Sequence, residues 1–195
     1  MHNSLRKIVK NNGWKKSFID GFSQDENGDP LPWMTYPAIK FLQSNLNKNH
    51  TIFEFGCGAS TLFFAKKVKR VLGLETNQRW FEIINKLLIQ ASCNNAELTL
   101  MQDGLTNHFY ENFAKNHEEK FDFIIVDSLK RFECAKNSIS VLKPQGSIVL
   151  DDSERKNYQK IFDFFAKTNF SKQDFWGISP GQLRIKNTTI FTRHC

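Results

Sequence analysis

The sequence has 195 residues, of which 40% are hydrophobic and 24% are charged, and this balance is typical of one globular domain with its own core. It contains no apolar run near the roughly 20 residues that span a bilayer, which excludes a membrane span. It contains no secretory signal, so a cytoplasmic location is expected, and no CxxC pair, which disfavours a zinc site. The net charge of +7 permits a nucleic-acid partner, but the basic residues are spread along the chain, which favours an ordinary solvated surface.

The first segment, residues 1–32, is a polar and basic N-terminal extension that ends in the loop signal SQDENGDP. Within it, Leu5, Ile8 and Val9 would share one face of a short helix. The main domain is expected over 33–195. It begins with a helix near Pro37, a residue that suits the first turn of a helix.

From residue 51 onward, strand and helix patterns alternate. The expected strands cover 51–56, 70–75, 96–102, 121–127 and 147–152, and the expected helices cover 60–68, 77–90, 107–116, 130–142 and 155–168. The segment KPQG stops the fourth of these helices, and two final strands, 171–178 and 187–193, follow each other without a helix between them. This order predicts an α/β fold with a doubly wound, mostly parallel sheet, whose ligands bind beyond the carboxyl ends of the strands.

The end of the first expected strand carries the clearest signal. Glu54 interrupts an apolar run, and a turn of small residues follows. Gly56 can adopt backbone angles closed to other residues, and Gly58 leaves room for close approach of a ligand. Ser60 or Thr61 can cap the next helix, whose free N–H groups attract negative charge. Because Thr61 stands where a dinucleotide fingerprint has its third glycine, the pattern disfavours NAD.

The second and third strands end in further acids. Glu75, roughly 20 residues beyond the glycine turn, suits hydrogen bonds to ribose hydroxyls, although it could simply be a favourable charge at a helix N-terminus. Asp103 could accept a hydrogen bond from an exocyclic amine such as that of adenine. The alternative is that Asp103 and Gly104 form an ordinary turn.

The fourth and fifth strands end in Asp127 and in the pair Asp151 and Asp152. These strands should be neighbours, so their carboxylates should converge. Converging carboxylates are costly unless a cation, a positive substrate group or a proton offsets them. The three acids could therefore hold a divalent metal such as Mg²⁺, bind an amino group or supply a general base. Alternatively, Asp152 or Ser153 could merely cap the following helix.

These segments resemble the class I S-adenosylmethionine-dependent methyltransferases. FEFGCGAST is similar to their first motif, acid-x-Gly-x-Gly, and Glu75, QDG, FDFIIVDS and LKPQGSIVLDD fall where later motifs of the family fall. The segments PWMTYPAIKFL, STLFFA and NTTIFTR resemble a poorly characterised bacterial branch. The resemblance implies a Rossmann-like sheet of seven strands with an antiparallel last strand, and an enzyme that uses S-adenosyl-L-methionine.

The same resemblance implies roles for individual residues. Glu54 would help to hold the methionine amino group, and the two glycines would let the methionine and ribose portions lie on the backbone. Glu75 would bind the ribose hydroxyls and Asp103 the adenine amine. Asp127 would face the sulfur and the acceptor. The three acids at the fourth and fifth strand ends are also similar to the metal-binding acids of catechol-type O-methyltransferases, with Asp152 in place of an asparagine.

The acceptor side is expected outside these motifs. Trp33 and Tyr36 are candidates for its rim, and Arg131, four residues after Asp127, could contact the acceptor or pair with the acids. Asp127 is the first candidate for a catalytic base and Asp151 the second. The favoured function is methyl transfer to an oxygen or nitrogen of a small molecule. The alternatives are an RNA methyltransferase, a non-catalytic cofactor-binding domain and an NAD-type oxidoreductase.

Overall fold

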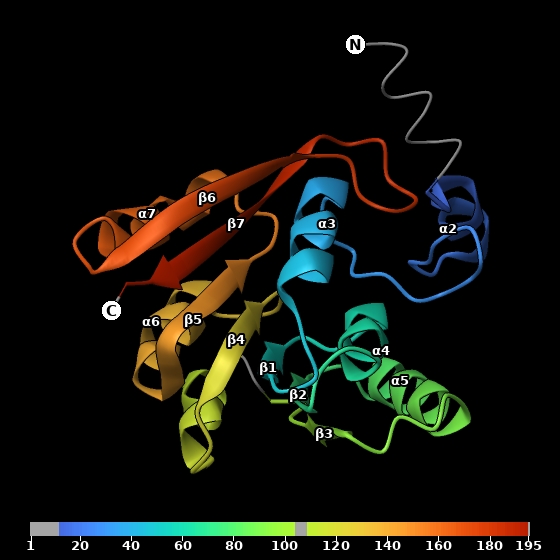
Figure 1. The fold of residues 1–195 in the computed structure, drawn as a ribbon, viewed down its shortest axis with the longest axis horizontal. Coiled ribbons are helices and arrows are strands. Elements are labelled where there is room, and N and C mark those ends of the chain that lie inside the picture. Colours follow the sequence, from blue (N-terminus) through green and yellow to red (C-terminus); the bar gives the residue numbers. More distant parts are fainter. Residues whose placement is uncertain (1–11, 104–108, 195) are drawn as a thin grey trace.

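A single seven-stranded sheet organises the computed structural model, which describes residues 12–103 and 109–194 (Figure 1). The strand order is β3-β2-β1-β4-β5-β7-β6, with β1 to β5 parallel and β7 antiparallel to both of its neighbours. The strands are β1 (Thr51–Phe55), β2 (Arg70–Glu75), β3 (Ala96–Leu100), β4 (Phe121–Val126), β5 (Leu142–Leu150), β6 (Phe170–Gly177) and β7 (Lys186–Arg193). The predicted fold class is confirmed, and the winding reverses between β1 and β4.

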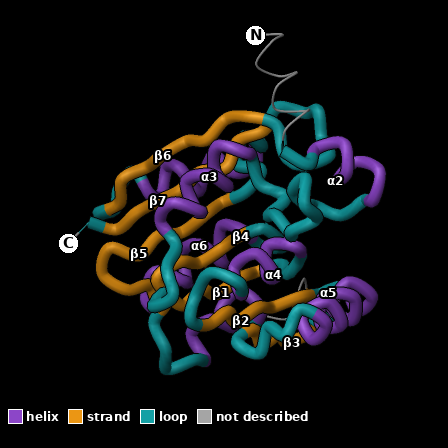
Figure 2. Tube along the Cα trace, turned by 45° about the vertical axis from the view of Figure 1, so that its right-hand side comes forward, coloured by secondary structure: helices purple, strands orange, loops and turns teal. Residues whose placement is uncertain are grey.

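Helices cover both faces of the sheet (Figures 1 and 2). One apolar cluster joins the sheet to α3, α4 and α5, and the other joins it to η1, α6 and α7. Because β1 is buried on both sides, its alternate side chains enter different clusters: Ile52 enters the first, and Phe53 and Phe55 enter the second. The helices are α2 (Trp14–Asp20), α3 (Tyr36–Asn45), α4 (Ala59–Ala65), α5 (Gln78–Gln90), α6 (Arg131–Ser138) and α7 (Gln159–Phe165), with short 3₁₀ turns η1 (Tyr110–Asn116), η2 (Ile139–Val141) and η3 (Lys156–Tyr158).

Capping side chains fix where two of the helices start. The Thr35 side chain accepts a hydrogen bond from the Ala38 N–H at the start of α3, and Pro37 occupies the first turn. The Asn77 side chain accepts from the N–H of Trp80 at the start of α5. The start of α5 follows the end of β2, and Trp80 in its first turn lines the cavity described below.

Several expected boundaries differ from the structure. KPQG does not end a helix before a strand but lies inside β5, where Gln145 has a φ of 60° and the register against β4 shifts. The expected helix over 155–168 is shorter, because η3 precedes α7, and the part of 107–116 that is described forms the 3₁₀ turn η1. Leu5, Ile8, Val9 and Gly104 lie outside the described residues.

The segment before α3 lies against the loop that joins β6 to β7. The indole N–H of Trp14 donates to the Gln182 carbonyl at 2.9 Å, and the indole N–H of Trp33 donates to the Pro180 carbonyl at 2.8 Å. In Figure 1 this loop, drawn in red, passes close to the blue N-terminal segment. Among the described residues, no helix has the length and apolar character needed to cross a membrane.

Candidate functional site

The glycine bend after β1 is shaped by its contact with the end of β4. Gly56 has a φ of 89°, and a Cβ atom placed there would lie 2.7 Å from the Asp127 carbonyl oxygen and 2.9 Å from the Ser128 Cβ. Only glycine fits this position without strain. Gly58 has extended backbone, and its added Cβ would meet the Trp80 ring no closer than 3.6 Å. A Cβ at Gly58 would therefore make ordinary van der Waals contacts rather than a clash.

Glu75 ties the end of β2 to this bend. Its Oε2 accepts a hydrogen bond from the Cys57 N–H at 2.9 Å, and its Oε1 accepts from the N–H groups of Thr76 and Asn77, both at 2.8 Å. The residue is 6% exposed and lines the cavity described below. A carboxylate oxygen can accept more than one hydrogen bond, so Glu75 can hold the bend and still accept from a ligand hydroxyl.

Glu54 lies behind the bend, fully buried, on the face of β1 that α4 covers. The Gly58 N–H donates to the Thr61 hydroxyl at 3.0 Å, and that hydroxyl donates to Glu54 Oε2 at 2.6 Å. The other oxygen, Oε1, is buried without a hydrogen-bond partner among the described residues. Burial raises the pKa of Glu54 to about 8, while the neighbouring hydroxyl groups of Ser60 and Thr61 oppose this effect. A positive ligand group beside this carboxyl would be strongly favoured.

A cavity of about 250 Å³ opens beside the bend. Trp80 forms one wall, and its indole N–H donates to the Cys57 carbonyl at 2.6 Å. Sequence patterns place Trp80 only on the apolar side of a helix, although its position five residues after Glu75, in the first turn of α5, was an available signal. The cavity is lined by Trp33, Gly56, Cys57, Gly58, Ala59, Ser60, Glu75, Trp80, Asp127 and Ser128.

The remaining candidate residues divide between the cavity and other surroundings. Trp33 lines the cavity, whereas Tyr36 lines a different hollow and donates its hydroxyl to the Asn12 carbonyl at 3.0 Å. Asp103 is exposed just beyond β3, next to residues that are not described. The structure therefore brings Trp33 to the predicted site but does not bring Tyr36 there.

Arg131 holds Asp127 at the end of β4. Its Nη2 donates to Asp127 Oδ1 at 2.8 Å, its Nε donates to the Ser128 carbonyl at 3.0 Å, and its Nη1 donates to the backbone carbonyl of Asp151. Arg131 is 8% exposed, so it lies behind Asp127 rather than on an open surface. Burial, together with the nearby Asp151 carboxylate, raises the pKa of Asp127, while Arg131 and Lys186 oppose this effect.

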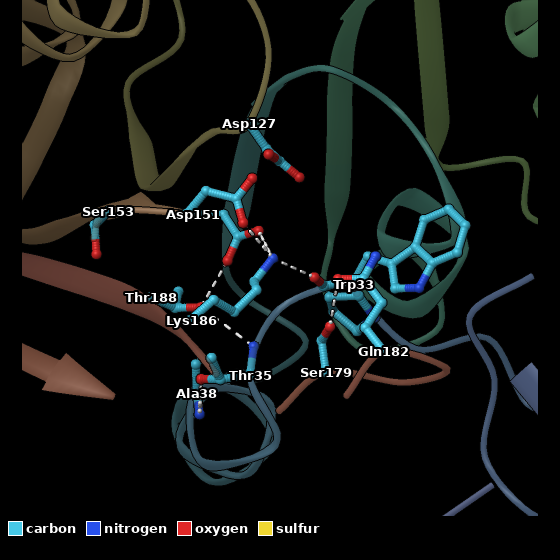
Figure 3. Close-up of polar contacts among 12 residues, drawn as sticks. Trp33, Thr35, Ala38, Asp127, Asp151, Ser153, Ser179, Gln182, Lys186 and Thr188 are labelled. Carbon is cyan, nitrogen blue, oxygen red and sulfur yellow. Dashed lines mark hydrogen bonds and ion pairs between the residues drawn. The ribbon is translucent and has the colours of Figure 1, made fainter. Parts of the chain in front are cut away.

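A buried lysine, Lys186, lies beside Asp151, just after the end of β5 (Figure 3). The Lys186 ammonium donates to Asp151 Oδ2 at 2.5 Å and to the Trp33 carbonyl at 2.9 Å, and it lies 2.8 Å from Asp152 Oδ1. Asp151 Oδ1 accepts from the Thr188 hydroxyl at 2.6 Å. The pKa of Lys186 is raised despite its burial, because both carboxylates favour the charged form. Sequence reasoning missed this residue.

Asp152 takes a φ of 50° and turns its carboxylate toward basic side chains. It pairs with Arg155 and, at 2.9 Å, with Arg184, in addition to Lys186. Arg155 and Arg184 thus share the charge of Asp152 with Lys186. The alternative that Asp152 or Ser153 caps the following helix is wrong, because neither η3 nor α7 has a side-chain cap. The Ser153 hydroxyl contacts the Thr189 hydroxyl on β7 instead.

The three carboxylates do not fit the divalent metal that their pattern predicts. One oxygen of each of Asp127, Asp151 and Asp152 lies within 4.8 Å of the others, which is close enough to suggest a shared cation. However, the cluster already contains the ammonium of Lys186 and is flanked by guanidinium groups. A further divalent ion would have to displace one of these partners, so we derive no step through a metal.

Among the comparisons with known proteins, only the one with solved structures finds matches, and these support the fold. No protein-family model matches the sequence, and no curated protein matches it. An rRNA methylase from Streptococcus thermophilus is 15% identical, with a TM-score of 0.63 over 81% of this chain and 96% of that chain. The O-methyltransferase TomG from Streptomyces achromogenes, solved with S-adenosylmethionine, is 14% identical, with a TM-score of 0.62 over 75% of this chain and 74% of that one.

A third similar structure is a precorrin-6y C5,15-methyltransferase from Geobacter metallireducens. It is 13% identical, with a TM-score of 0.63 over 89% of this chain and 95% of that chain. The chain thus has the Rossmann-like fold of class I S-adenosylmethionine-dependent methyltransferases, in agreement with the resemblance seen in the sequence. The named acceptors of the three structures differ in chemistry, and the fold by itself does not choose among them.

Proposed function

We propose that this chain is a methyltransferase that binds S-adenosyl-L-methionine across the glycine bend and methylates an oxygen or nitrogen of a small molecule. The single observation that carries the proposal is the bend itself, held by Glu75 on one side and backed by the unpartnered Glu54 oxygen on the other. The adenosine ribose would lie against Glu75, and the methionine amino group would lie toward Glu54. The exposed Asp103 would reach the adenine amine.

The proposed chemistry is an in-line displacement at the sulfonium. The acceptor's lone pair forms a bond to the methyl carbon, the carbon–sulfur bond breaks, and its electron pair stays on the now neutral sulfur. The protein has mainly to align the donor and the acceptor and to exclude water. The proton released by the acceptor would pass to Asp127, whose raised pKa suits a general base near neutral pH. Arg131 would act through Asp127, because its nitrogens are already engaged.

A small acceptor is favoured over RNA by the charges around the site. RNA binding depends on basic side chains that are free to neutralise phosphates. Around the three aspartates, the basic side chains of the described residues are in ion pairs: Lys186, Arg131, Arg155 and Arg184. Trp33 would then form one wall of the acceptor pocket, since its ring is fixed by Pro180 and its carbonyl by Lys186.

Two measurements test this proposal. Calorimetry should show that the purified chain binds S-adenosylmethionine and S-adenosylhomocysteine at one site, and a chain that binds neither would refute the cofactor assignment. Labelled cofactor should then transfer its methyl group to the small-molecule fraction of a cell extract rather than to its RNA. Transfer into RNA, with binding that weakens steeply between two salt concentrations, would instead identify a nucleic-acid acceptor.

A further inference from the structure

Lys186 uses its whole hydrogen-bonding capacity inside the protein. An ammonium group has three N–H donors, and the ammonium of Lys186 has three oxygen neighbours within 2.9 Å, on Asp151, Asp152 and the Trp33 backbone. The residue is 3% exposed. Lys186 therefore has no donor left for a substrate, and its charge serves the carboxylates around it.

The ammonium contacts two of the three carboxylates that a shared metal would need, Asp151 and Asp152. One oxygen of each of these two aspartates lies within 2.8 Å of the ammonium, and an oxygen of Asp127 lies within 4.8 Å of an oxygen on each of them. Figure 3 shows Asp127 close to Asp151. Mg²⁺ requires about six oxygen ligands at roughly 2.0–2.1 Å, and Ca²⁺ requires six to eight at roughly 2.3–2.6 Å. An ammonium that already contacts two of the three carboxylates leaves no room for such a shell. Lys186 and a divalent ion would therefore exclude each other.

The chain order explains how the lysine reaches this point. Lys186 begins β7, which runs antiparallel beside β5 and so brings residues near position 186 next to the end of β5. Thr188 lies two residues after Lys186, on the same face of β7. Its hydroxyl donates a hydrogen bond to Asp151 Oδ1 and accepts one from the Thr35 N–H at 3.2 Å. Lys186 and Thr188 thus join the acids that follow β5 to the segment that carries Trp33.

We propose that Lys186 is a built-in cation that takes the place of a divalent metal in this cluster. It would position Asp151 and Asp152, and it would connect them to Trp33 at the wall of the cavity. The positioning role rests on the proposed methyl transfer, whereas the exclusion of metal depends only on the charges and distances in the cluster. The site would accordingly work without Mg²⁺, and a divalent ion would enter only when the lysine is removed.

The test is a titration with Mn²⁺. Binding is monitored by the decrease in the electron spin resonance signal of unbound Mn²⁺ and, separately, by calorimetry. The wild-type chain should bind no Mn²⁺ in this cluster. Lys186→Ala should bind one Mn²⁺ per chain, with a dissociation constant at least tenfold below that of any unspecific binding to the wild type. The matched control is Lys172→Ala, which removes an exposed lysine that pairs with Asp174 at 2.7 Å and should leave Mn²⁺ binding unchanged. Adding Asp151→Asn to Lys186→Ala should abolish the gain.

Two results would overturn the proposal: a wild-type chain that binds one Mn²⁺ which Asp151→Asn abolishes, or a folded Lys186→Ala chain that binds none. If the alanine variant does not fold alone, Mn²⁺ should restore its thermal unfolding transition, and Lys186→Gln provides the same titration in a chain that keeps a polar group at this position. Binding of S-adenosylmethionine to the wild-type chain is measured separately. Its absence would refute the proposed function while leaving the Mn²⁺ result to be judged alone.

Discussion

Replacing Glu54 with glutamine should abolish most of the proton release that accompanies S-adenosylmethionine binding at pH 7. The Glu54 carboxyl is fully buried, its Oε1 has no partner among the described residues, and its pKa is raised to about 8. At that pKa about nine-tenths of the chains carry a proton on Glu54 at pH 7. The cofactor's amino group, arriving as an ammonium, favours the ionised carboxylate and lowers this pKa.

The expected size of the release follows from the shift. An opposite charge at close range lowers a carboxyl pKa by about 1–3 units, and a shift of about 2 units leaves roughly one-tenth of the chains protonated at pH 7. Binding should therefore release about 0.8 proton per cofactor at pH 7. Because the free protein is already ionised well above pH 8, the release should fall toward zero at pH 9 to 10.

The assay is calorimetry in buffers with different enthalpies of ionisation, such as phosphate and Tris. A released proton makes the apparent binding enthalpy depend on the buffer, and the slope gives the number of protons. Glu54→Gln keeps the shape of the side chain but cannot ionise, so the difference between the two slopes isolates the Glu54 proton from any taken up by the cofactor. Equal slopes for wild type and variant would refute the role assigned to Glu54.

Three further substitutions test the rest of the site. Asp127→Asn should leave the dissociation constant for S-adenosylmethionine nearly unchanged in calorimetry while lowering single-turnover methyl transfer about 10²–10⁴-fold, and equal losses in both would make Asp127 only a cofactor ligand. Glu75→Ala should weaken cofactor binding by about 1–3 kcal/mol. The control is Glu97→Ala, which removes an exposed glutamate paired with Arg70 and should leave cofactor binding unchanged. Unchanged affinity in Glu75→Ala would exclude the ribose contact. In Gly56→Ala the new Cβ would lie 2.7 Å from the Asp127 carbonyl oxygen. This variant should lower the free energy of unfolding by more than about 1 kcal/mol in urea titrations, and it should weaken cofactor binding. Unchanged stability and affinity would show that the bend can move.

Local sequence patterns were sufficient to predict most of the fold. The strand predicted at 70–75 matches β2, and the strands predicted near β1, β4 and β7 differ from the structure by about one residue. These elements are defined by apolar periodicity and by the residues that end them, which are properties of neighbouring residues. Errors arose where tertiary pairing overrides local signals. KPQG contains both Pro and Gly, yet pairing with β4 through a register shift draws it into β5.

The sequence alone also located the cavity, because the ends of parallel strands must converge where the winding reverses. It therefore identified Glu54, Gly56, Glu75 and Asp127 as residues of one region. The sequence did not reveal which cation neutralises Asp151 and Asp152. Lys186 is 35 positions from its partner Asp151, and only the antiparallel pairing of β7 with β5 brings them together. Periodicity and turn chemistry act between neighbours in the chain, whereas the cost of burying a charge depends on whatever the folded chain places beside it. That is why the sequence determined the strands and the region of the candidate site, and only the tertiary structure decided that a lysine lies among the carboxylates.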